Sequence, residues 1–332
     1  MSSVIDASSR VRSVTAGCDM VTCGVGFASF VPGLITRVVR GLAFHPPKPP
    51  GYHVTPERRV LLVRPKCELI PLPDLSSEGI RVDVVRMWTR RMNSVHAFHF
   101  KRADAHGTLL FSHGNGTDIG NMYEYLCDLC RELGSDIFAY DYSGYGESSG
   151  VPSEADLCAD IDAAYQYLTM DLDAPCSTIF LYGQSIGSVP ALDLASRKDV
   201  GGVILQSALK SGLSLVHNVQ TTFWFDVFKN IEKIRHVRAP VFVMHGTLDT
   251  EVPLDHGMDL HAACPPEWAF EPWWAEYAGH NDIDMVHRDA YLAKLRGFIQ
   301  TCLAVHRKFG HQGIDEDSEH CERDYAYQWQ PP

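Results

Sequence analysis

The chain has 332 residues, of which 45% are apolar, enough for one large α/β domain with extensions. Its 41 acidic and 29 basic residues give a formal net charge of −12, which argues against a nucleic-acid partner. Ten cysteines show no spacing typical of a disulfide framework or a complete zinc site. We therefore expect reduced thiols, a cytosolic environment, and neither a metal ion nor a cofactor.

The N-terminal region, residues 1–50, is predicted to be a membrane-association segment that ends in a proline-rich linker. Its apolar stretch, residues 20–35, is short for a membrane span. The apolar helical face that follows has Arg37 and Arg40 on its opposite side, which suits a helix at a membrane surface. Packing against the protein's own domain is an equally good alternative. Two cysteines beside this segment are candidate acylation sites: Cys18 and Cys23.

Residues 51–303 are predicted to form one domain in which strands and helices alternate. Three strand-like runs come first, and the expected strands are 60–63, 80–87, 95–100, 108–112, 137–141, 179–182, 203–206, 241–244 and 273–277. The expected helices are 118–133, one that begins at a capping box at 153–156, and 289–302. Such alternation predicts an α/β fold with a mostly parallel central sheet flanked by helices, and the early strands can supply an antiparallel edge.

The segment from 211 to 233 is too short for a large lid and predicts only a short cap. Its aromatic residues either line an acyl-binding groove or belong to the core, and they are Phe223, Trp224, Phe225 and Phe228. The polar and acidic tail, residues 304–332, lacks periodicity and is predicted to be disordered.

The sequence Gly183-Gln-Ser-Ile-Gly187 lies between a β-branched, aromatic run and a stretch compatible with a helix. This strand, turn and helix arrangement is typical of a nucleophile elbow, which makes Ser185 the candidate nucleophile. The same pattern occurs again at 146–150, but Val151 and Pro152 follow it instead of a helix. We therefore expect Ser148 to be an ordinary turn serine.

A serine nucleophile needs a histidine base and an acid that orients the base. In a sheet of this kind the acid and then the histidine follow later strands. Asp249 comes just after the strand at 241–244, and His280 just after the strand at 273–277. Asp226 and Asp255 are alternative acids that the sequence leaves open.

The oxyanion hole of such a site needs two backbone N–H groups. Ile186, directly after the candidate nucleophile, is expected to supply one of them. The other is expected from the loop after the strand at 108–112, where Asn115 is favoured and Gly116 is the neighbouring alternative.

The chain resembles the α/β-hydrolase superfamily, and within it the α/β-hydrolase-domain-17 family of membrane-associated protein depalmitoylases. The motifs that carry the resemblance lie at 111–115, 140–148, 159–164, 181–187, 193–197, 230–233, 245–247 and 278–282. The resemblance implies an α/β-hydrolase fold, thioester hydrolysis of S-palmitoylated proteins, and Ser185, Asp249 and His280 at the triad positions. The family's dense N-terminal cysteine cluster is reduced here to Cys18 and Cys23, which predicts weaker anchoring or a different membrane.

The leading hypothesis is therefore a palmitoyl-protein thioesterase at the cytosolic face of a membrane, peripheral when acylated and cytoplasmic when not. Its expected partners are S-acylated proteins and the membrane surface. A carboxylesterase or lipase, an aminopeptidase-like serine peptidase and a non-catalytic scaffold are the alternatives. The complete triad argues against the scaffold.

Overall fold

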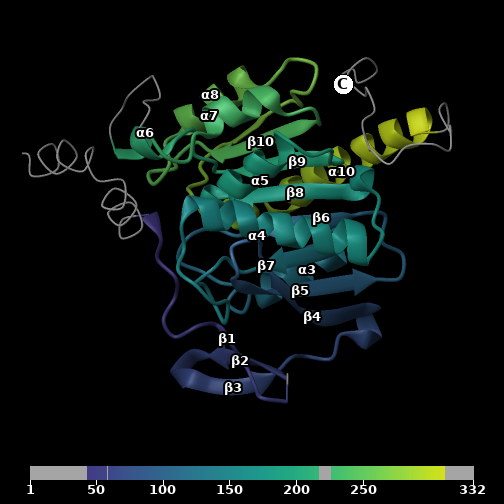
Figure 1. Ribbon diagram of the computed structural model, residues 1–332. Helices are drawn as coiled ribbons and strands as arrows, with labels where there is room; N and C mark the ends of the chain where they lie inside the picture. Colours follow the sequence, from purple (N-terminus) through teal and green to yellow (C-terminus); the bar gives the residue numbers. More distant parts are fainter. Residues whose placement is uncertain (1–42, 58, 217–225, 311–332) are drawn as a thin grey trace, which may run out of the picture.

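The computed structural model describes residues 43–57, 59–216 and 226–310 (Figure 1). Cys18, Cys23 and the apolar stretch before Arg37 lie outside these residues, as do Phe223, Trp224 and Phe225 of the expected cap. The same holds for the tail beyond residue 310. Within the described residues, no helix combines the length and the apolar character needed to cross a membrane.

An eight-stranded sheet runs through the centre of the molecule in the order β11-β10-β9-β8-β6-β7-β5-β4. Every pairing from β11 to β7 is parallel, whereas β4 and β5 pair antiparallel with each other and β5 pairs antiparallel with β7. The mostly parallel sheet and its antiparallel edge are thus confirmed. The strands are β4 (Ile80–Trp88), β5 (Ser94–Arg102), β6 (Thr108–Ser112), β7 (Asp136–Tyr140), β8 (Ile179–Gln184), β9 (Gly202–Gln206), β10 (Val241–Gly246) and β11 (Trp273–Ala275).

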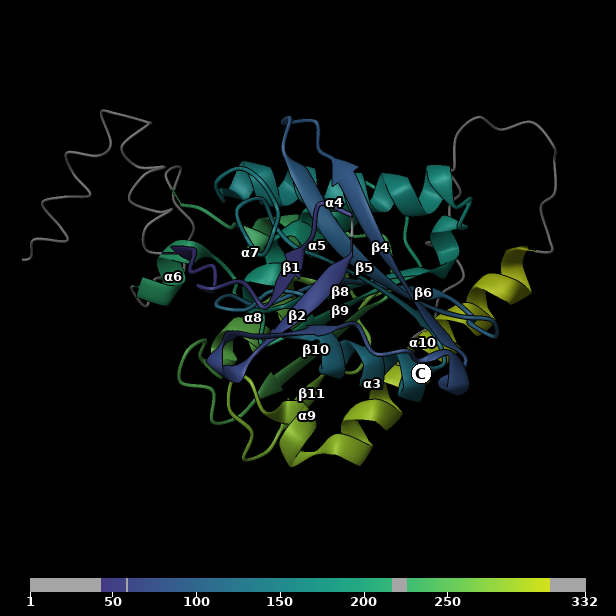
Figure 2. The same ribbon diagram turned by 90° about the horizontal axis from the view of Figure 1, so that it is seen from below.

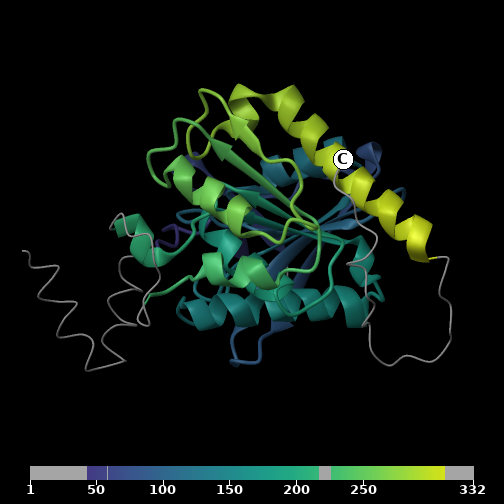
Figure 3. The same cartoon turned by 90° about the horizontal axis from the view of Figure 1, so that it is seen from above.

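Helices cover both faces of this sheet. The longer ones are α3 (Tyr123–Leu133), α4 (Glu154–Gln166), α5 (Ser188–Ala195), α8 (Leu254–Ala263) and α10 (Arg288–Gly310). Figures 2 and 3 show α4 and α5 on one face and α3 and α10 on the other. Ser153 is the N-cap of α4, as expected, because its hydroxyl accepts the N–H of Asp156 at 3.2 Å.

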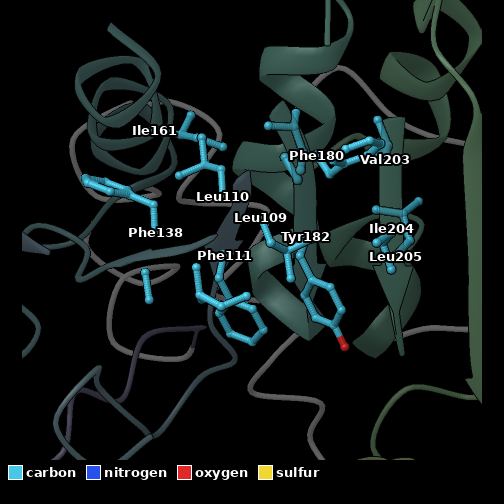
Figure 4. Packing of buried hydrophobic residues seen from close by; sticks show 14 of the residues in the cluster. Leu109, Leu110, Phe111, Phe138, Ile161, Phe180, Tyr182, Val203, Ile204 and Leu205 are labelled. Atoms are coloured by element: carbon cyan, nitrogen blue, oxygen red, sulfur yellow. The ribbon is translucent and has the colours of Figure 1, made fainter. Parts of the chain in front are cut away.

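The central strands are buried on both sides, which explains their continuous apolar runs. Leu109, Phe111, Tyr182 and Leu205, from three adjacent strands, are fully buried, and the rings of Phe111 and Tyr182 stack at 4.6 Å (Figure 4). This rigid core fixes the carboxyl ends of β6, β8, β10 and β11, where all the candidate catalytic residues follow their strands.

Three expected elements differ from the observed ones. The strand at Val60 does not join the central sheet, because it pairs with its sequence neighbours in a separate sheet of β1 (Tyr52–Val54), β2 (Val60–Arg64) and β3 (Glu68–Pro71). The helix expected from Asp118 begins at Tyr123, since the Asp118 carboxylate instead accepts the N–H groups of Gly51 and Asn121 in a turn. The last helix does not end at Cys302 but continues to Gly310.

The expected cap contains two short helices, α6 (Gly212–Val216) and α7 (Asn230–Lys233). Phe228 before α7 is buried and packs edge-on against Phe44, with ring centroids 5.9 Å apart. Of the two roles left open for the cap aromatics, Phe228 therefore takes the core role.

Candidate active site

The turn after β8 holds Ser185 in a left-handed backbone conformation, with φ of 52°. A non-glycine residue adopts this conformation only where its surroundings impose it. Both flanking glycines are required by close packing: a Cβ on Gly183 would lie 2.7 Å from the Cα of Ser188, and one on Gly187 would lie 2.1 Å from the carbonyl oxygen of Ser112. The turn is the sharp strand-to-helix connection expected of a nucleophile elbow.

The second match to the same pattern lies in a different environment. Ser148 is buried in a turn, where its N–H donates to the carbonyl of Tyr145 and its hydroxyl accepts the N–H of His96 at 3.0 Å. Its hydroxyl is thus used within the fold, as expected of a turn serine.

The structure brings Ser185, His280 and Asp249 together in one hydrogen-bonded chain. His280 Nε2 lies 2.9 Å from Ser185 Oγ, and His280 Nδ1 lies 2.7 Å from Asp249 Oδ2. An ionised carboxylate can only accept hydrogen bonds, so His280 donates one to Asp249 through Nδ1. Its Nε2 atom is therefore unprotonated and can take the proton of the Ser185 hydroxyl. These contacts are those required of a base and of an acid that orients it.

Asp249 is buried and is the best-connected residue of the site. Burial by itself raises the pKa of this carboxyl, but hydrogen bonds from His245 and His280 and from the backbone N–H of Val252 lower the pKa well below its usual range. Its Oδ1 atom accepts the N–H groups of Glu251 and Val252 at 2.9 and 2.8 Å. The carboxylate therefore stays ionised and fixed in orientation.

The alternative acids do not reach His280. Asp226 accepts the N–H groups of Leu213 and Val227 through Oδ1, and Asp255 pairs with Lys210 at 3.2 Å. The backbone of His280 is also anchored, because its carbonyl accepts the hydroxyl of Ser207 at 3.0 Å. The acid that orients the histidine in this structure is thus Asp249.

The candidate oxyanion loop packs directly against the elbow. A Cβ on Gly187 would lie only 2.9 Å from the carbonyl oxygen of His113, so the two backbones are in close contact. The N–H of Gly116 donates to the Asn115 side chain at 3.0 Å and is therefore engaged. The geometry favours the N–H of Asn115 over that of Gly116 as the partner of the Ile186 N–H.

The side chain of Asn115 binds the first described residues of the chain. Its Nδ2 donates to the carbonyl of Ala43 at 2.9 Å, and its Oδ1 accepts the N–H of His45 at 2.9 Å and the hydroxyl of Tyr145 at 2.7 Å. The residues just before the proline-rich linker are thus hydrogen-bonded to the candidate oxyanion loop.

Two residues of the site were not identified from the sequence. His245 Nε2 lies 3.1 Å from Asp249 Oδ2 and 2.8 Å from the carbonyl of Val252, and Glu251 Oε2 lies 4.0 Å from His280 Nε2. The sequence signals for them were the resemblance motif at 245–247, which includes His245, and the position of Glu251 two residues after Asp249. Within the part of the chain that the structure describes, no group of three or more His, Cys, Asp or Glu side chains is arranged to hold a metal ion.

Sequence comparisons match the chain to one family model and to individual proteins. Residues 103–224 match the family model described as "Serine aminopeptidase, S33". The "Alpha/beta hydrolase domain-containing protein aho-3" of Caenorhabditis elegans is 40% identical over 81% of this chain and 79% of its own length. The "Alpha/beta hydrolase domain-containing protein 17C" of Mus musculus is 38% identical over 81% of this chain and 91% of its own length.

Comparison with solved structures concerns the fold. The esterase Pf2001 of Pyrococcus furiosus matches 70% of this chain and 96% of its own with a TM-score of 0.60 at 15% identity. The esterase RhEst1 of a Rhodococcus species matches 66% of this chain and 99% of its own with a TM-score of 0.52 at 17% identity. The α/β-hydrolase fold expected from the sequence is thereby confirmed.

Proposed function

The chain belongs to the α/β-hydrolase-domain-17 family, and we propose that it is a serine hydrolase that removes long-chain acyl groups from S-acylated cysteines. The observation that carries the proposal is the hydrogen-bonded chain from Ser185 through His280 to Asp249, on an elbow held at φ of 52°. A site of this geometry activates a serine hydroxyl for attack on an acyl carbonyl.

In the proposed reaction, Ser185 Oγ attacks the thioester carbonyl while its proton passes to His280 Nε2. The N–H groups of Ile186 and Asn115 stabilise the oxyanion. The C–S bond then breaks, and His280 returns the proton to the departing cysteine sulfur. Water, deprotonated by His280, hydrolyses the acyl-enzyme and restores Ser185. Asp249 holds the imidazole in the required tautomer and stabilises its cation throughout.

Apolar side chains on the catalytic loops support an acyl substrate. Leu248, directly before Asp249, is 59% exposed, and Tyr277, three residues before His280, is 75% exposed. The two loops are joined, since the N–H of Tyr277 donates to the hydroxyl of Thr247 at 3.0 Å. Exposed apolar residues beside a reactive centre suit contact with a lipid chain or a lipid surface.

We further propose that the enzyme acts as a peripheral protein on the cytosolic face of a membrane, with S-acylated membrane proteins as substrates. The support is the apolar and basic composition of the N-terminal region, with Cys18 and Cys23 as acylation candidates. A single acyl chain anchors marginally, so stable binding needs acylation together with the apolar segment.

Labelling with a fluorophosphonate, followed by assays on matched long-chain acyl thioesters and oxygen esters, tests the activity. We expect labelling and thioester hydrolysis in the wild type and the loss of both in Ser185→Ala, by about a millionfold for turnover. Ser148→Ala is the matched control, because its serine lies in the second Gly-x-Ser-x-Gly sequence and should keep both activities. A labelled enzyme that hydrolyses only oxygen esters would contradict the thioesterase assignment and favour a carboxylesterase.

A further inference from the structure

Beside the candidate catalytic residues lies a carboxylate, that of Glu251, which the proposed reaction does not use. Glu251 Oε2 lies 4.0 Å from His280 Nε2, and its side chain is 64% exposed. Its backbone N–H donates to Asp249 Oδ1 at 2.9 Å, and its Oε1 accepts from Asn281 Nδ2 at 3.3 Å. Glu251 is therefore fixed relative to the catalytic residues at its backbone and at one carboxylate oxygen, while the other oxygen faces the reacting region.

The position of Glu251 identifies which part of a substrate it meets. His280 Nε2 receives the proton of Ser185 and returns it to the leaving atom, so the leaving group must pass close to Nε2. The acyl oxygen instead points to the N–H groups of Ile186 and Asn115. A carboxylate whose oxygen lies 4.0 Å from Nε2 is thus placed on the leaving-group side of the site. For an S-acylated protein, this side holds the cysteine and its neighbouring residues.

We propose that Glu251 is a specificity residue that selects leaving groups with a cationic side chain, lysine or arginine, beside the acylated cysteine. This inference rests on the proposed hydrolase function and adds the charge of the preferred substrate. Among the residues that the structure describes, no lysine or arginine forms an ion pair with Glu251, so its charge remains available to a substrate. Paired opposite charges near an exposed surface favour binding modestly, and salt weakens them.

The test compares short peptides that carry one S-octanoyl cysteine flanked by lysine, glutamine or glutamate, with both peptide ends blocked. For the wild type at low ionic strength, we expect kcat/KM to be about two- to fivefold higher with lysine than with glutamine, and lowest with glutamate. Glu251→Gln should bring the lysine-to-glutamine ratio close to one, and Glu251→Lys should invert the order. Raising the salt concentration should reduce the wild-type ratio.

Glu271→Gln is the matched control, because it removes the same charge from an exposed residue that precedes the amino end of β11, whereas His280 follows the carboxyl end of that strand. Its lysine-to-glutamine ratio should equal that of the wild type. A wild-type ratio near one, or a ratio that survives in Glu251→Gln, would overturn the proposal. If Glu251 only stabilised the His280 cation, its replacement would slow all peptides alike and leave the ratio unchanged.

The same peptides with an O-octanoyl serine separate this inference from the proposed thioesterase activity. If the enzyme cleaves only the oxygen esters, the thioesterase assignment fails, yet the flanking-residue ratio on these esters still measures selection by Glu251. If both series are cleaved without discrimination, the hydrolase function stands and the role of Glu251 is wrong.

Discussion

At the scale of single residues, one carboxylate organises the candidate site. Asp249 accepts two backbone N–H groups through Oδ1. Its Oδ2 atom lies 2.7 Å from Nδ1 of His280 and 3.1 Å from Nε2 of His245. Only His280 of this pair reaches Ser185, and His245 is fully buried beneath the site. His245 Nε2 donates to the carbonyl of Val252 and lies 3.1 Å from Asp249 Oδ2, so we regard it as a positioning residue.

His245→Phe should lower kcat about tenfold with little change in KM, because it removes a hydrogen bond that orients Asp249 without touching the substrate. His245→Gln can still donate an N–H and should recover part of the loss. Asp249→Asn should lose far more, about 10⁴-fold in kcat, through the wrong histidine tautomer. Steady-state kinetics on one soluble thioester compares all three, and a Phe variant as active as the wild type would refute the role of His245.

At the scale of elements, the described chain begins against the loop after β6. Ala43 and His45 bind the Asn115 side chain, and Phe44 between them is buried against Phe228. The last residues of the N-terminal region before its proline-rich linker therefore hold the side chain of the candidate oxyanion residue Asn115. A truncation placed after His45 removes these contacts, whereas one placed before Ala43 keeps them.

Deleting residues 1–40 should release the protein from membranes while hydrolysis of a short, soluble thioester survives, because the triad and the Asn115 contacts remain. Deleting residues 1–45 should release it equally but also lower kcat about tenfold, since Asn115 loses two of its partners. Membrane fractionation and kinetics with the soluble substrate measure the two effects.

The matched control for anchoring is the double variant Cys18→Ser and Cys23→Ser, which should reduce membrane binding without any change in kcat on the soluble thioester. Thermal melting of the longer deletion shows whether loss of Phe44 unfolds the domain. A full-length protein that is wholly soluble, with or without hydroxylamine treatment, would contradict the anchoring proposal.

At the scale of the whole molecule, the buried carboxyls of Asp249 and Asp160 make the free energy of unfolding change with pH in opposite directions. Hydrogen bonds lower the pKa of Asp249, so its stabilising contribution is lost as the pH falls. Asp160 on α4 is fully buried, and burial raises its pKa to about 7 although the N–H and hydroxyl of Ser143 donate to it. Asp160 keeps its proton in the folded protein at a pH where the unfolded chain has lost it.

Between about pH 4 and pH 7, unfolding therefore releases the Asp160 proton, and a rising pH favours the unfolded state. Asp160→Asn removes this titration, so the wild type should lose stability relative to the variant over this range, by up to about 4 kcal/mol. Urea unfolding of both proteins at several pH values measures the difference in the free energy of unfolding. A difference that does not vary with pH would show that Asp160 is ionised in the folded state.

Local sequence determined the central α/β architecture and the order of the candidate catalytic residues. Buried parallel strands need continuous apolar runs, and a tight strand-to-helix turn needs Gly183 and Gly187, so both features are visible in the chain itself. The candidate roles of Asp249 and His280 could also be predicted, because both residues follow predicted strands and active sites of parallel sheets form at the carboxyl ends of strands.

Only the tertiary structure decided which distant groups meet. No periodic pattern in the sequence predicts three of the observed contacts. These are the pairing of β2 outside the central sheet, the hydrogen bonds of Ala43 and His45 with Asn115, and the approach of Glu251 to His280. Each depends on how loops far apart in the chain pack against one another, whereas hydrophobic periodicity reports only which face of a single element is buried. The sequence thus determined the fold and the candidate triad, and packing decided which residues orient the triad and surround it.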